Sequence, residues 1–380
     1  MARIAVAMSG GVDSSVAAGV LAAQGHQVIG FTLNLWPAWL TGETDAAAKA
    51  CCGVGAVEDA RAVARRLGIR HYVLNVREEF QRAVIDYFCD EYTEGRTPNP
   101  CIACNRAVKF SLLLNKALGL GFDYLATGHY ARVRYDETRG RYLLLRAADA
   151  RKDQGYVLYG LTQGQLARLT LPVGELDKAR TRRIAGEMGL PVADKPDSQE
   201  ICFVPGGDYR EVVRFLRPEA MRPGPILDTS GRVLGEHRGM AGYTVGQRRG
   251  LGLAAERPFY VVALDTSRNA VIVGGETELL SDELEADGVN WIAVESLDDP
   301  RRCTARIRHA AREIPAEVAP LPRGRVRVRF DEPQRAVTPG QAVCFYNGDV
   351  VLGGGTIVRA RGVAERARFN SHAQEALPVG

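Results

Sequence analysis

The sequence predicts a protein of the α/β plus β class, in which a parallel, doubly wound nucleotide-binding domain is followed by a small β domain and a C-terminal β-barrel. Strand-like and helix-like segments alternate from Ile4 to Gly189, which is typical of a parallel sheet covered by helices. Prolines and hairpin signals replace helical patterns after about Arg217. The chain of 380 residues is also too long for one typical core, so two or three domains are expected.

The alternating part begins with a strand over Ile4–Met8 and a helical stretch of small residues that ends near Gly25. The next expected strands are Val28–Leu33, His71–Val76 and Tyr124–Thr127, and the expected helices are Glu58–Leu67, Phe80–Glu94, Asn105–Leu118, Asp177–Gly189 and Tyr209–Leu216. Ligands of parallel sheets bind beyond the carboxyl ends of the strands. Ser9 and the Gly128–His129 turn are therefore expected at the ligand-binding edge.

Turn and strand patterns predict β structure in the second part of the chain. The stretches DTSGRV (Asp228–Val233) and DTSRNA (Asp265–Ala270) lie between apolar runs and indicate hairpins. The stretch RVRVRF (Arg325–Phe330) alternates arginine with apolar residues, as in a strand with one buried face. We predict a catalytic domain over residues 1–207, a small β domain over 208–275, a barrel over 276–365 and a frayed tail over 366–380.

Composition favours a cytoplasmic globular protein without a membrane segment. The chain is 46% hydrophobic and 25% charged, and it shows neither a signal peptide nor an apolar run long enough to span a bilayer. Eight cysteines without a secretion signal suggest reduced thiols. The net charge of +4 indicates little, but Arg301–Arg335 holds ten arginines against four acidic residues, a local excess of +6 that suits an anionic partner.

The stretch SGGVDSS (Ser9–Ser15) is expected to bind phosphate at the end of the first strand. Glycines let the backbone approach an anion, the following helix contributes the positive end of its dipole, and the serines add hydroxyl donors. The stretch matches neither the Walker pattern nor the dinucleotide pattern. Asp13 among phosphate donors suggests an accompanying Mg²⁺. The alternative is an ordinary strand–turn–helix connection.

Three interpretations of the cysteines compete. A structural zinc site would need four ligands, and the half-site Cys101–Cys104 has only the adjacent pair Cys51–Cys52 to complete it, which is poor metal spacing. Inert buried thiols suit Cys89, Cys303 and Cys344, which lie in helix- or strand-like runs. Redox or sulfur-transfer thiols suit Cys104 and Cys202, which we expect in loops. If Asn105 caps the following helix, Cys104 lies at its N-terminus, where a thiolate is stabilised.

Taken together, eight motifs resemble those of the bacterial tRNA-specific 2-thiouridylases, a family within the N-type ATP-pyrophosphatase superfamily. They follow one another from Ile4 to about Ile357: SGGVDSS, GRTPNPCIACN, ATGHYAR, KDQGYVLYGL, DSQEICF, GYTVGQRRGLG, ARIRHA and VTPGQAVCFYNGDVVLGGG. The resemblance implies an enzyme that uses ATP and Mg²⁺, without a tightly bound organic cofactor or a structural metal, to adenylate O2 of uridine 34 in the anticodon of tRNAs for Lys, Glu and Gln. A persulfide sulfur then replaces that oxygen, which gives 2-thiouridine, AMP and pyrophosphate.

The resemblance also assigns roles to residues. Cys202 corresponds to the persulfide carrier and Cys104 to the nucleophile, and the two would form a transient disulfide. The implied partners are tRNA and a sulfur donor, either a cysteine desulfurase or a persulfide relay protein. The ATP site would comprise Ala7, Met8, Ser9, Gly10, Gly11, Val12, Asp13, Ser14, Leu33 and Gly128. The tRNA contacts would comprise Asn99, Pro100, Cys101, His129, Lys152, Asp153, Gln154, Arg308, His309 and Gln341, with Asn99, Pro100 and Cys101 facing the target base.

One position departs from the pattern of many members. Cys101 stands where they have an Asp with an activating role beside the nucleophile, while other members carry the same C-x-x-C form. Cys101 is therefore a competitor of Cys104 for the attacking role.

Two rival functions remain open at this point. Another ATP-pyrophosphatase, such as a GMP synthetase or an argininosuccinate synthase, would share the phosphate loop but has no task for paired loop cysteines. A non-catalytic RNA-binding protein would need neither an intact Ser9–Ser15 loop nor Cys104 and Cys202. Turnover of ATP to AMP that depends on unmodified tRNA distinguishes the three.

Overall fold

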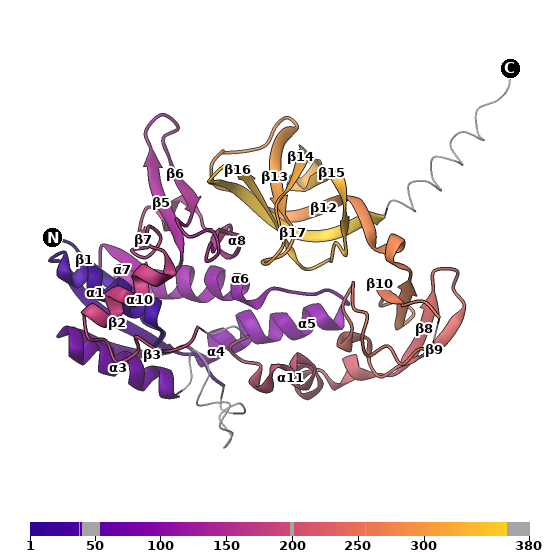
Figure 1. Ribbon diagram of the computed structural model, residues 1–380, viewed down its shortest axis with the longest axis horizontal. Coiled ribbons are helices and arrows are strands. Elements are labelled where there is room, and N and C mark those ends of the chain that lie inside the picture. The colour runs from indigo at the N-terminus through magenta and orange to yellow at the C-terminus, as the bar shows by residue number, and fades with distance from the viewer. Residues whose placement is uncertain (38, 40–53, 198–200, 255, 363–380) are drawn as a thin grey trace.

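The computed structural model describes residues 1–37, 39, 54–197, 201–254 and 256–362. Cys51, Cys52 and the predicted tail over 366–380 lie outside the described residues. Within the described part, none of the helices combines the length and the apolar character that crossing a bilayer requires. Figure 1 shows an N-terminal α/β part, a β sheet at the far end and a barrel above the helices that join them.

The first part contains a five-stranded parallel sheet with the strand order β3-β2-β1-β4-β7. Its strands are β1 (Arg3–Ala7), β2 (Gln27–Asn34), β3 (Arg70–Asn75), β4 (Tyr124–Thr127) and β7 (Leu169–Thr170). The order reverses between β1 and β4, and open α/β sheets bind ligands at such a switch point. Ser9 follows β1 and Gly128 follows β4, so both lie at the carboxyl ends of neighbouring strands, as expected from the sequence.

Most of the predicted helices occur close to their expected bounds, whereas α6 begins earlier than expected and the short α8 and α9 were not predicted. They are α1 (Val12–Ala23), α3 (Val54–Leu67), α4 (Arg77–Phe80), α5 (Tyr87–Thr93), α6 (Pro100–Cys104), α7 (Leu114–Gly119), α8 (Gly155–Leu158), α9 (Gln163–Leu166), α10 (Lys178–Glu187) and α11 (Tyr209–Leu216). Two π-helical segments, Gln81–Asp86 and Asn105–Leu113, join α4 to α5 and α6 to α7. Each predicted long helix is therefore continuous but changes its winding in the middle.

The second part is all β apart from short 3₁₀ turns at Pro205–Gly207, Pro218–Met221, Met240–Gly242, Glu276–Leu279 and Pro322–Gly324. A four-stranded sheet contains β8 (Gly224–Asp228), β9 (Val233–His237), β10 (Tyr260–Asp265) and β11 (Ala270–Gly274). Both predicted hairpins occur there, at the β8–β9 and β10–β11 turns. The barrel strands are β12 (Leu280–Trp291), β13 (Arg301–Arg306), β14 (Ile314–Pro320), β15 (Val326–Arg335), β16 (Ala342–Asn347) and β17 (Val350–Gly362).

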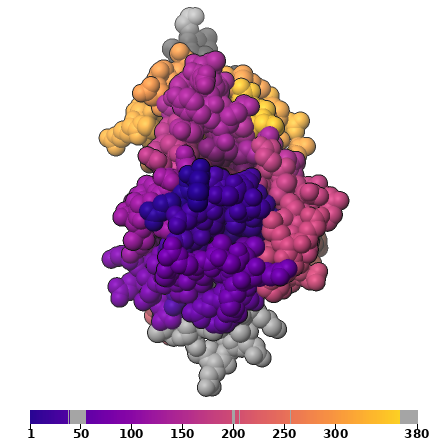
Figure 2. Space-filling view, turned by 90° about the vertical axis from the view of Figure 1, so that its left-hand side faces the viewer, coloured from indigo at the N-terminus to yellow at the C-terminus, as the bar shows by residue number. Residues whose placement is uncertain are grey.

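The barrel closes through the pairing of β12 with β17, as the expected architecture requires. In β15 the valines at 326 and 328 are buried and the arginines at 327 and 329 are exposed, which confirms the alternating pattern. A hairpin that the sequence patterns did not predict, β5 (Ala131–Asp136) with β6 (Arg141–Arg146), extends this sheet from the N-terminal part by pairing with β17. Figure 2 looks onto the N-terminal part and shows the barrel only behind the top of that face.

Candidate functional site

The turn after β1 is shaped so that a backbone can approach an anion. Gly10 has a φ of +69°, and a Cβ at this position would lie 2.9 Å from the Cα of Ala56. Helix α1 begins at Val12, and its N-cap residue Gly11 has no side chain that could cap the first N–H groups of the helix. The helix therefore presents its positive end beyond the turn.

Gly128 brings the end of β4 against the same helix terminus. A Cβ at Gly128 would lie 2.6 Å from the carbonyl carbon of Asp13 and 2.8 Å from the Cα of Ser14, so only glycine permits this approach. The hydroxyls of Ser9 and Ser14 lie 3.3 Å apart, and the Ser15 hydroxyl donates to the Gly11 carbonyl oxygen at 2.8 Å. The structure thus brings the predicted Ser9, Gly10, Gly11, Ser14 and Gly128 together at one turn.

The carboxylate of Asp13 has hydrogen-bonding and ion-pair partners from other parts of the chain. Its Oδ1 accepts a hydrogen bond from the Tyr130 hydroxyl at 2.7 Å and lies 2.7 Å from Nζ of Lys178. Tyr130 also contacts the Thr181 hydroxyl at 3.1 Å. Lys178 is the first residue of α10, so its ion pair with Asp13 links α10 to α1 beside the turn.

A second carboxylate, Asp197, forms ion pairs with three cationic side chains beside the turn. Its oxygens lie 2.7 Å from Nζ of Lys178, 2.8 Å from Nζ of Lys152 and 3.2 Å from Nη2 of Arg182. Burial opposes the charged form, but the hydrogen bonds from Lys152 and Lys178 prevail and lower the pKa of Asp197. Asp13, Lys178, Asp197 and Lys152 form one continuous chain of ion pairs, which we call the Asp197 network.

Another lysine fixes the glycine turn itself. Nζ of Lys195 donates to the Gly10 carbonyl oxygen at 3.1 Å and to Asp59 Oδ2 at 2.6 Å. The sequence reasoning missed Lys178 and Lys195, because isolated lysines on a helix and in a loop carry no motif. Four cations and three carboxylates therefore gather around the turn, which leaves an excess of positive charge at an anion-binding edge.

The donor set fits a polyphosphate ligand. Gly10 and Gly128 let the turn pack closely against Ala56 and against the start of α1, and a helix N-terminus and lysines lie beside the turn. It also fits a Mg²⁺ ion held mainly by phosphates and water, since Oδ1 of Asp13 is shared with Lys178 and Tyr130. Among the described residues, no group of three or more His, Cys, Asp or Glu side chains is arranged to hold a metal ion.

The cysteine segment differs from the sequence prediction at the helix start. The helix begins at Pro100, not after Asn105, and Asn99 caps it by accepting from the N–H groups of Cys101 at 3.1 Å and Ile102 at 3.4 Å. The proline at the first helical position and the Asn before it form a strong start signal that the prediction overlooked. Cys104 therefore lies within the helix, and the prediction that it lies in a loop at the N-terminus is wrong.

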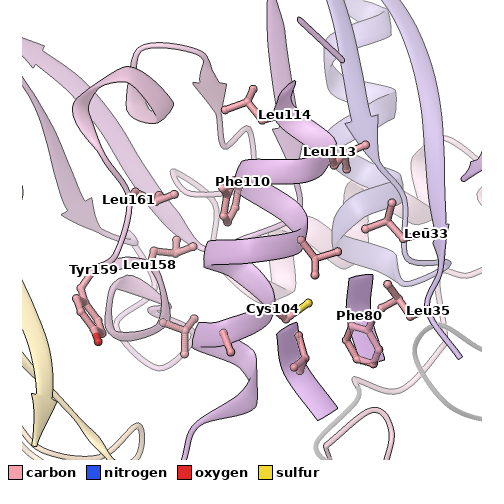
Figure 3. Close-up of a cluster of buried hydrophobic side chains, with 14 of the residues drawn as sticks. Leu33, Leu35, Phe80, Cys104, Phe110, Leu113, Leu114, Leu158, Tyr159 and Leu161 are labelled. Carbon is pink, nitrogen blue, oxygen red and sulfur yellow. The ribbon is translucent and has the colours of Figure 1, made fainter. Parts of the chain in front are cut away.

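Exposure separates the two thiols of this segment. Cys101 is exposed and belongs to the first turn of α6, whereas Cys104 is only 8% exposed. Figure 3 shows the sulfur of Cys104 turned toward the side on which Phe80 and Leu35 lie, away from Tyr159. The helix dipole, which acts over the first turn, therefore favours a thiolate at the exposed position of Cys101.

Cys202 reaches the same core from a distant part of the chain. It is partly buried and packs against the hydrophobic cluster that contains Cys104 and Phe80. Its neighbour Phe203 packs edge-on against Phe80, with ring centroids 5.9 Å apart. The two predicted sulfur-transfer cysteines thus border one cluster, although 98 positions separate them in the sequence. Ser198–Glu200 of the motif before Cys202 lie outside the described residues.

The other described cysteines have the inert character predicted for them. Burial raises the pKa of the thiols of Cys89, Cys303 and Cys344 to about 12. At neutral pH these thiols stay protonated and do not act as nucleophiles.

Two of the residues predicted to contact tRNA have structural partners. Asp153 is 6% exposed, accepts from the N–H groups of Ala147 and Gly155, and lies 3.5 Å from Nη1 of Arg306 in the barrel. Oε1 of Gln154 accepts from the Tyr130 N–H at 2.8 Å. Lys152 is more open, although its ammonium is paired with Asp197.

His129 packs against the π-helical segment that follows α6. Its Nδ1 lies 2.7 Å from the Thr127 hydroxyl oxygen, and its ring lies 5.6 Å from that of Phe110. Burial, and to a lesser degree Lys109, lower the pKa of His129 well below its ordinary value, so the ring is neutral at physiological pH.

The barrel carries fewer unpaired arginines than its composition suggests. Arg302 pairs with Asp331, Arg306 with Glu313 and Arg325 with Glu285. Arg308 and His309 are exposed, and Nη2 of Arg308 donates to the Arg335 carbonyl oxygen at 3.1 Å. Asp331 and Glu313 lie within the arginine-rich stretch itself, and Glu285 of β12 reduces the local excess of positive charge further.

Gln341, the remaining barrel residue predicted to contact tRNA, points toward the N-terminal part. Its Nε2 donates to the Thr97 carbonyl oxygen at 2.8 Å. This contact places the barrel against the segment that leads into the cysteine helix.

Comparisons with known proteins agree with this layout. Three family models match in order: the tRNA methyl transferase HUP domain over residues 2–206, the tRNA methyl transferase PRC-barrel domain over 214–275 and the aminomethyltransferase beta-barrel domain over 281–357. The tRNA-specific 2-thiouridylase MnmA of Moorella thermoacetica is 58% identical, with 93% of this chain and 98% of that protein covered. The protein of the same name from Symbiobacterium thermophilum is 56% identical, with 94% and 92% covered.

The chain belongs to the tRNA-specific 2-thiouridylase family. A further member of this family, from Roseiflexus castenholzii, is 53% identical over 94% of this chain and 100% of its own length. Among solved structures, a 4-thiouridine synthetase in complex with RNA and ATP covers 57% of this chain and 51% of its own at 20% identity, with a TM-score of 0.36. That score is too low to support an argument.

Proposed function

We propose that this chain is an ATP-dependent tRNA sulfurtransferase that converts uridine 34 of the tRNAs for Lys, Glu and Gln to 2-thiouridine. Membership of the family supports tRNA thiolation as the activity. The observation that carries the proposal for this chain is the convergence of a phosphate cradle and a cysteine helix at the same end of one parallel sheet.

The first step activates the base. O2 of uridine attacks the α-phosphorus of ATP, and pyrophosphate leaves. The glycine turn at Gly10 and Gly128 holds the phosphates, and the N-terminus of α1 with Lys178 and Lys195 offsets the charge of the leaving pyrophosphate. Mg²⁺, held by the phosphates and by Asp13, would supply further charge neutralisation.

The second step moves sulfur. The outer sulfur of a persulfide on Cys202 forms a bond to C2 of the base, and the C2–O bond breaks with AMP as the leaving group. The thiolate of Cys104 attacks the inner sulfur of Cys202 and breaks its bond to the transferred sulfur. The electron pair of that bond stays on the transferred sulfur, which becomes the thiocarbonyl, and a Cys104–Cys202 disulfide remains for a thiol reductant to open.

The sulfur enters from a donor protein. A cysteine desulfurase or a persulfide relay protein would load Cys202, which is partly accessible at the edge of the core cluster. Cys104 is 8% exposed and belongs to the core cluster against which Cys202 packs, so the attack of one sulfur on the other would take place away from bulk solvent.

The decisive experiment supplies the purified chain with an unmodified tRNA transcript, ATP, Mg²⁺ and a cysteine desulfurase with cysteine. We expect 2-thiouridine in the digested nucleosides and one AMP for each thiouridine, and we expect neither when uridine 34 is replaced by cytidine. AMP formation that does not depend on tRNA would identify another ATP-pyrophosphatase. Binding of tRNA without any AMP would identify a non-catalytic RNA-binding protein.

A further inference from the structure

A turn of the barrel contacts the segment that leads into α6, and the proposed reaction does not by itself account for this contact. This segment, Glu94–Asn99, returns from the end of α5 and runs beneath the barrel to α6 (Figure 1). The barrel turn Thr338–Gln341 joins β15 to β16. We call the contacts between the two the barrel clamp.

Two hydrogen bonds form the barrel clamp, and the backbone of Thr97 donates one of them and accepts the other. The Thr97 N–H donates to the Pro339 carbonyl oxygen at 2.9 Å, and the Thr97 carbonyl oxygen accepts from Gln341 Nε2 at 2.8 Å. The same nitrogen lies 3.5 Å from the Pro98 carbonyl oxygen. Both groups that face the Gln341 nitrogen are carbonyl acceptors, so the contact needs a donor at this position.

Gly340 allows the two backbones to meet. Its φ is +89°, and a Cβ there would lie 2.7 Å from the Thr97 nitrogen and 2.9 Å from the Arg96 Cβ. The barrel side of the clamp is itself fixed, because the Gly340 N–H donates to the Ile357 carbonyl oxygen at 2.8 Å and Ile357 N–H donates to the Gln341 carbonyl oxygen at 2.8 Å.

The clamped segment has little freedom between Thr97 and the cysteines. Pro98 and Pro100 fix their φ angles, and the Asn99 side chain caps the first turn of α6. Cys101 follows Thr97 by four positions and Cys104 by seven. A displacement of Thr97 is therefore transmitted to the start of α6 and to the thiols on it.

We propose that Gln341 and Gly340 are positioning residues for sulfur transfer. The barrel clamp keeps α6 and its cysteines correctly placed relative to the substrate base only while the barrel contacts the segment before α6. This inference rests on the proposed thiolation activity and changes the role expected for Gln341. A residue that only touches tRNA would govern affinity, whereas a clamp residue governs the rate of the chemical step after tRNA is bound.

The test measures single-turnover formation of 2-thiouridine at saturating tRNA, together with the Kd for tRNA. For Gln341→Ala we expect a rate on the order of 10-fold lower, because loosening of α6 by a fraction of an ångström misplaces a reacting thiol. We expect the Kd to change by less than about twofold. In Gly340→Ala the new Cβ would lie 2.7 Å from the Thr97 nitrogen, which is 0.7 Å short of ordinary contact at 3.4 Å. We therefore expect a loss of rate at least as large as that of Gln341→Ala.

Two variants serve as controls. Gln334 is a buried barrel glutamine whose Nε2 donates to Glu332, within the barrel, so Gln334→Ala should leave the rate within about twofold. Arg308→Ala removes an exposed cation and should raise the Kd instead.

Each outcome decides between the interpretations. Wild-type thiolation with an unchanged rate in Gln341→Ala and Gly340→Ala, or a loss that saturating tRNA restores, would overturn the clamp and leave Gln341 as a tRNA contact. An equal rate loss in Gln334→Ala would also overturn it, as a general effect on the barrel. No thiolation by the wild-type chain would instead contradict the proposed function.

Discussion

Replacing Gly128 by alanine tests the phosphate cradle most directly. The new Cβ would lie 2.4 Å from the backbone nitrogen of Ser14, which is 1.0 Å short of the 3.4 Å at which ordinary contact begins. The opposing atoms belong to the backbone at the start of α1, so no side chain can turn aside. The end of β4 and the N-terminus of α1 must therefore separate by about 1.0 Å.

A displacement of that size affects the chemical step more than the stability of the fold. Misplacement of bound reactants by about 1 Å costs on the order of 100-fold in rate. We therefore expect the Gly128→Ala chain to release pyrophosphate from ATP, with saturating unmodified tRNA, about 100-fold more slowly than the wild-type chain. The matched control is Gly186→Ala in α10, where a Cβ meets nothing within 4 Å and alanine favours the helix.

The assay is a rapid-quench measurement of pyrophosphate with thermal unfolding of each variant recorded beside it. A Gly128→Ala chain that unfolds like the wild type and releases pyrophosphate at the wild-type rate would refute the assignment of this turn as the phosphate cradle. A loss shared by Gly186→Ala would show that the measurement reports general damage.

Three further changes test the remaining parts of the site. Asp197→Asn should destabilise the chain by about 2 kcal/mol in thermal or urea unfolding, because three cations lose their shared carboxylate, whereas the exposed Asp331→Asn should leave the unfolding midpoint nearly unchanged. Since the folded pKa of Asp197 is lowered, this stabilisation is present above about pH 3.9 and is lost as the pH falls through the folded pKa, so the difference between wild type and Asp197→Asn should shrink in acid. Cys104→Ser and Cys202→Ser should each abolish 2-thiouridine while tRNA-dependent pyrophosphate release continues, and Cys101→Ser should retain part of the thiolation; full thiolation by Cys104→Ser, or a Cys101–Cys202 disulfide in the products, would reverse the assignment of the nucleophile. Asp13→Ala should abolish pyrophosphate release with tRNA affinity within a few fold, because it removes the carboxylate that orients Lys178 and faces the phosphates, and wild-type release would contradict this.

Local signals were sufficient for the elements and for the phosphate turn. β4 and α11 have the bounds that the patterns predict, and both hairpins occur at the predicted Asp-Thr-Ser turns. The phosphate cradle stays a prediction, and it could be proposed from the sequence because its donors are backbone N–H groups, serine hydroxyls and a helix terminus that lie within seven consecutive residues. The start of α6 was mispredicted although Asn99 and Pro100 carry a local signal, because Asn105 begins a second apolar pattern.

Contacts across long stretches of chain could not be predicted. Lys178 pairs with Asp13 across 165 positions, and Gln341 donates to Thr97 across 244. No periodicity or spacing encodes which lysine faces which carboxylate. The same holds for the β5–β6 hairpin, whose pairing partner in the barrel lies about 200 positions later, as Leu145 with Val350 shows.

The two halves of the proposed reaction therefore depend on the sequence in different ways. In this proposal phosphate binding rests on one short turn, which Gly128 and Lys195 contact from distant parts of the chain. Sulfur transfer rests on Cys104 and Cys202, which meet only through a shared core cluster, and on a barrel turn that holds the segment before α6. Destabilising the contact between the barrel and Thr97 should consequently impair thiolation before it impairs adenylation, because α1 and the cradle make no part of that contact. A Gln341→Ala chain in which pyrophosphate release falls as far as 2-thiouridine formation would contradict this separation.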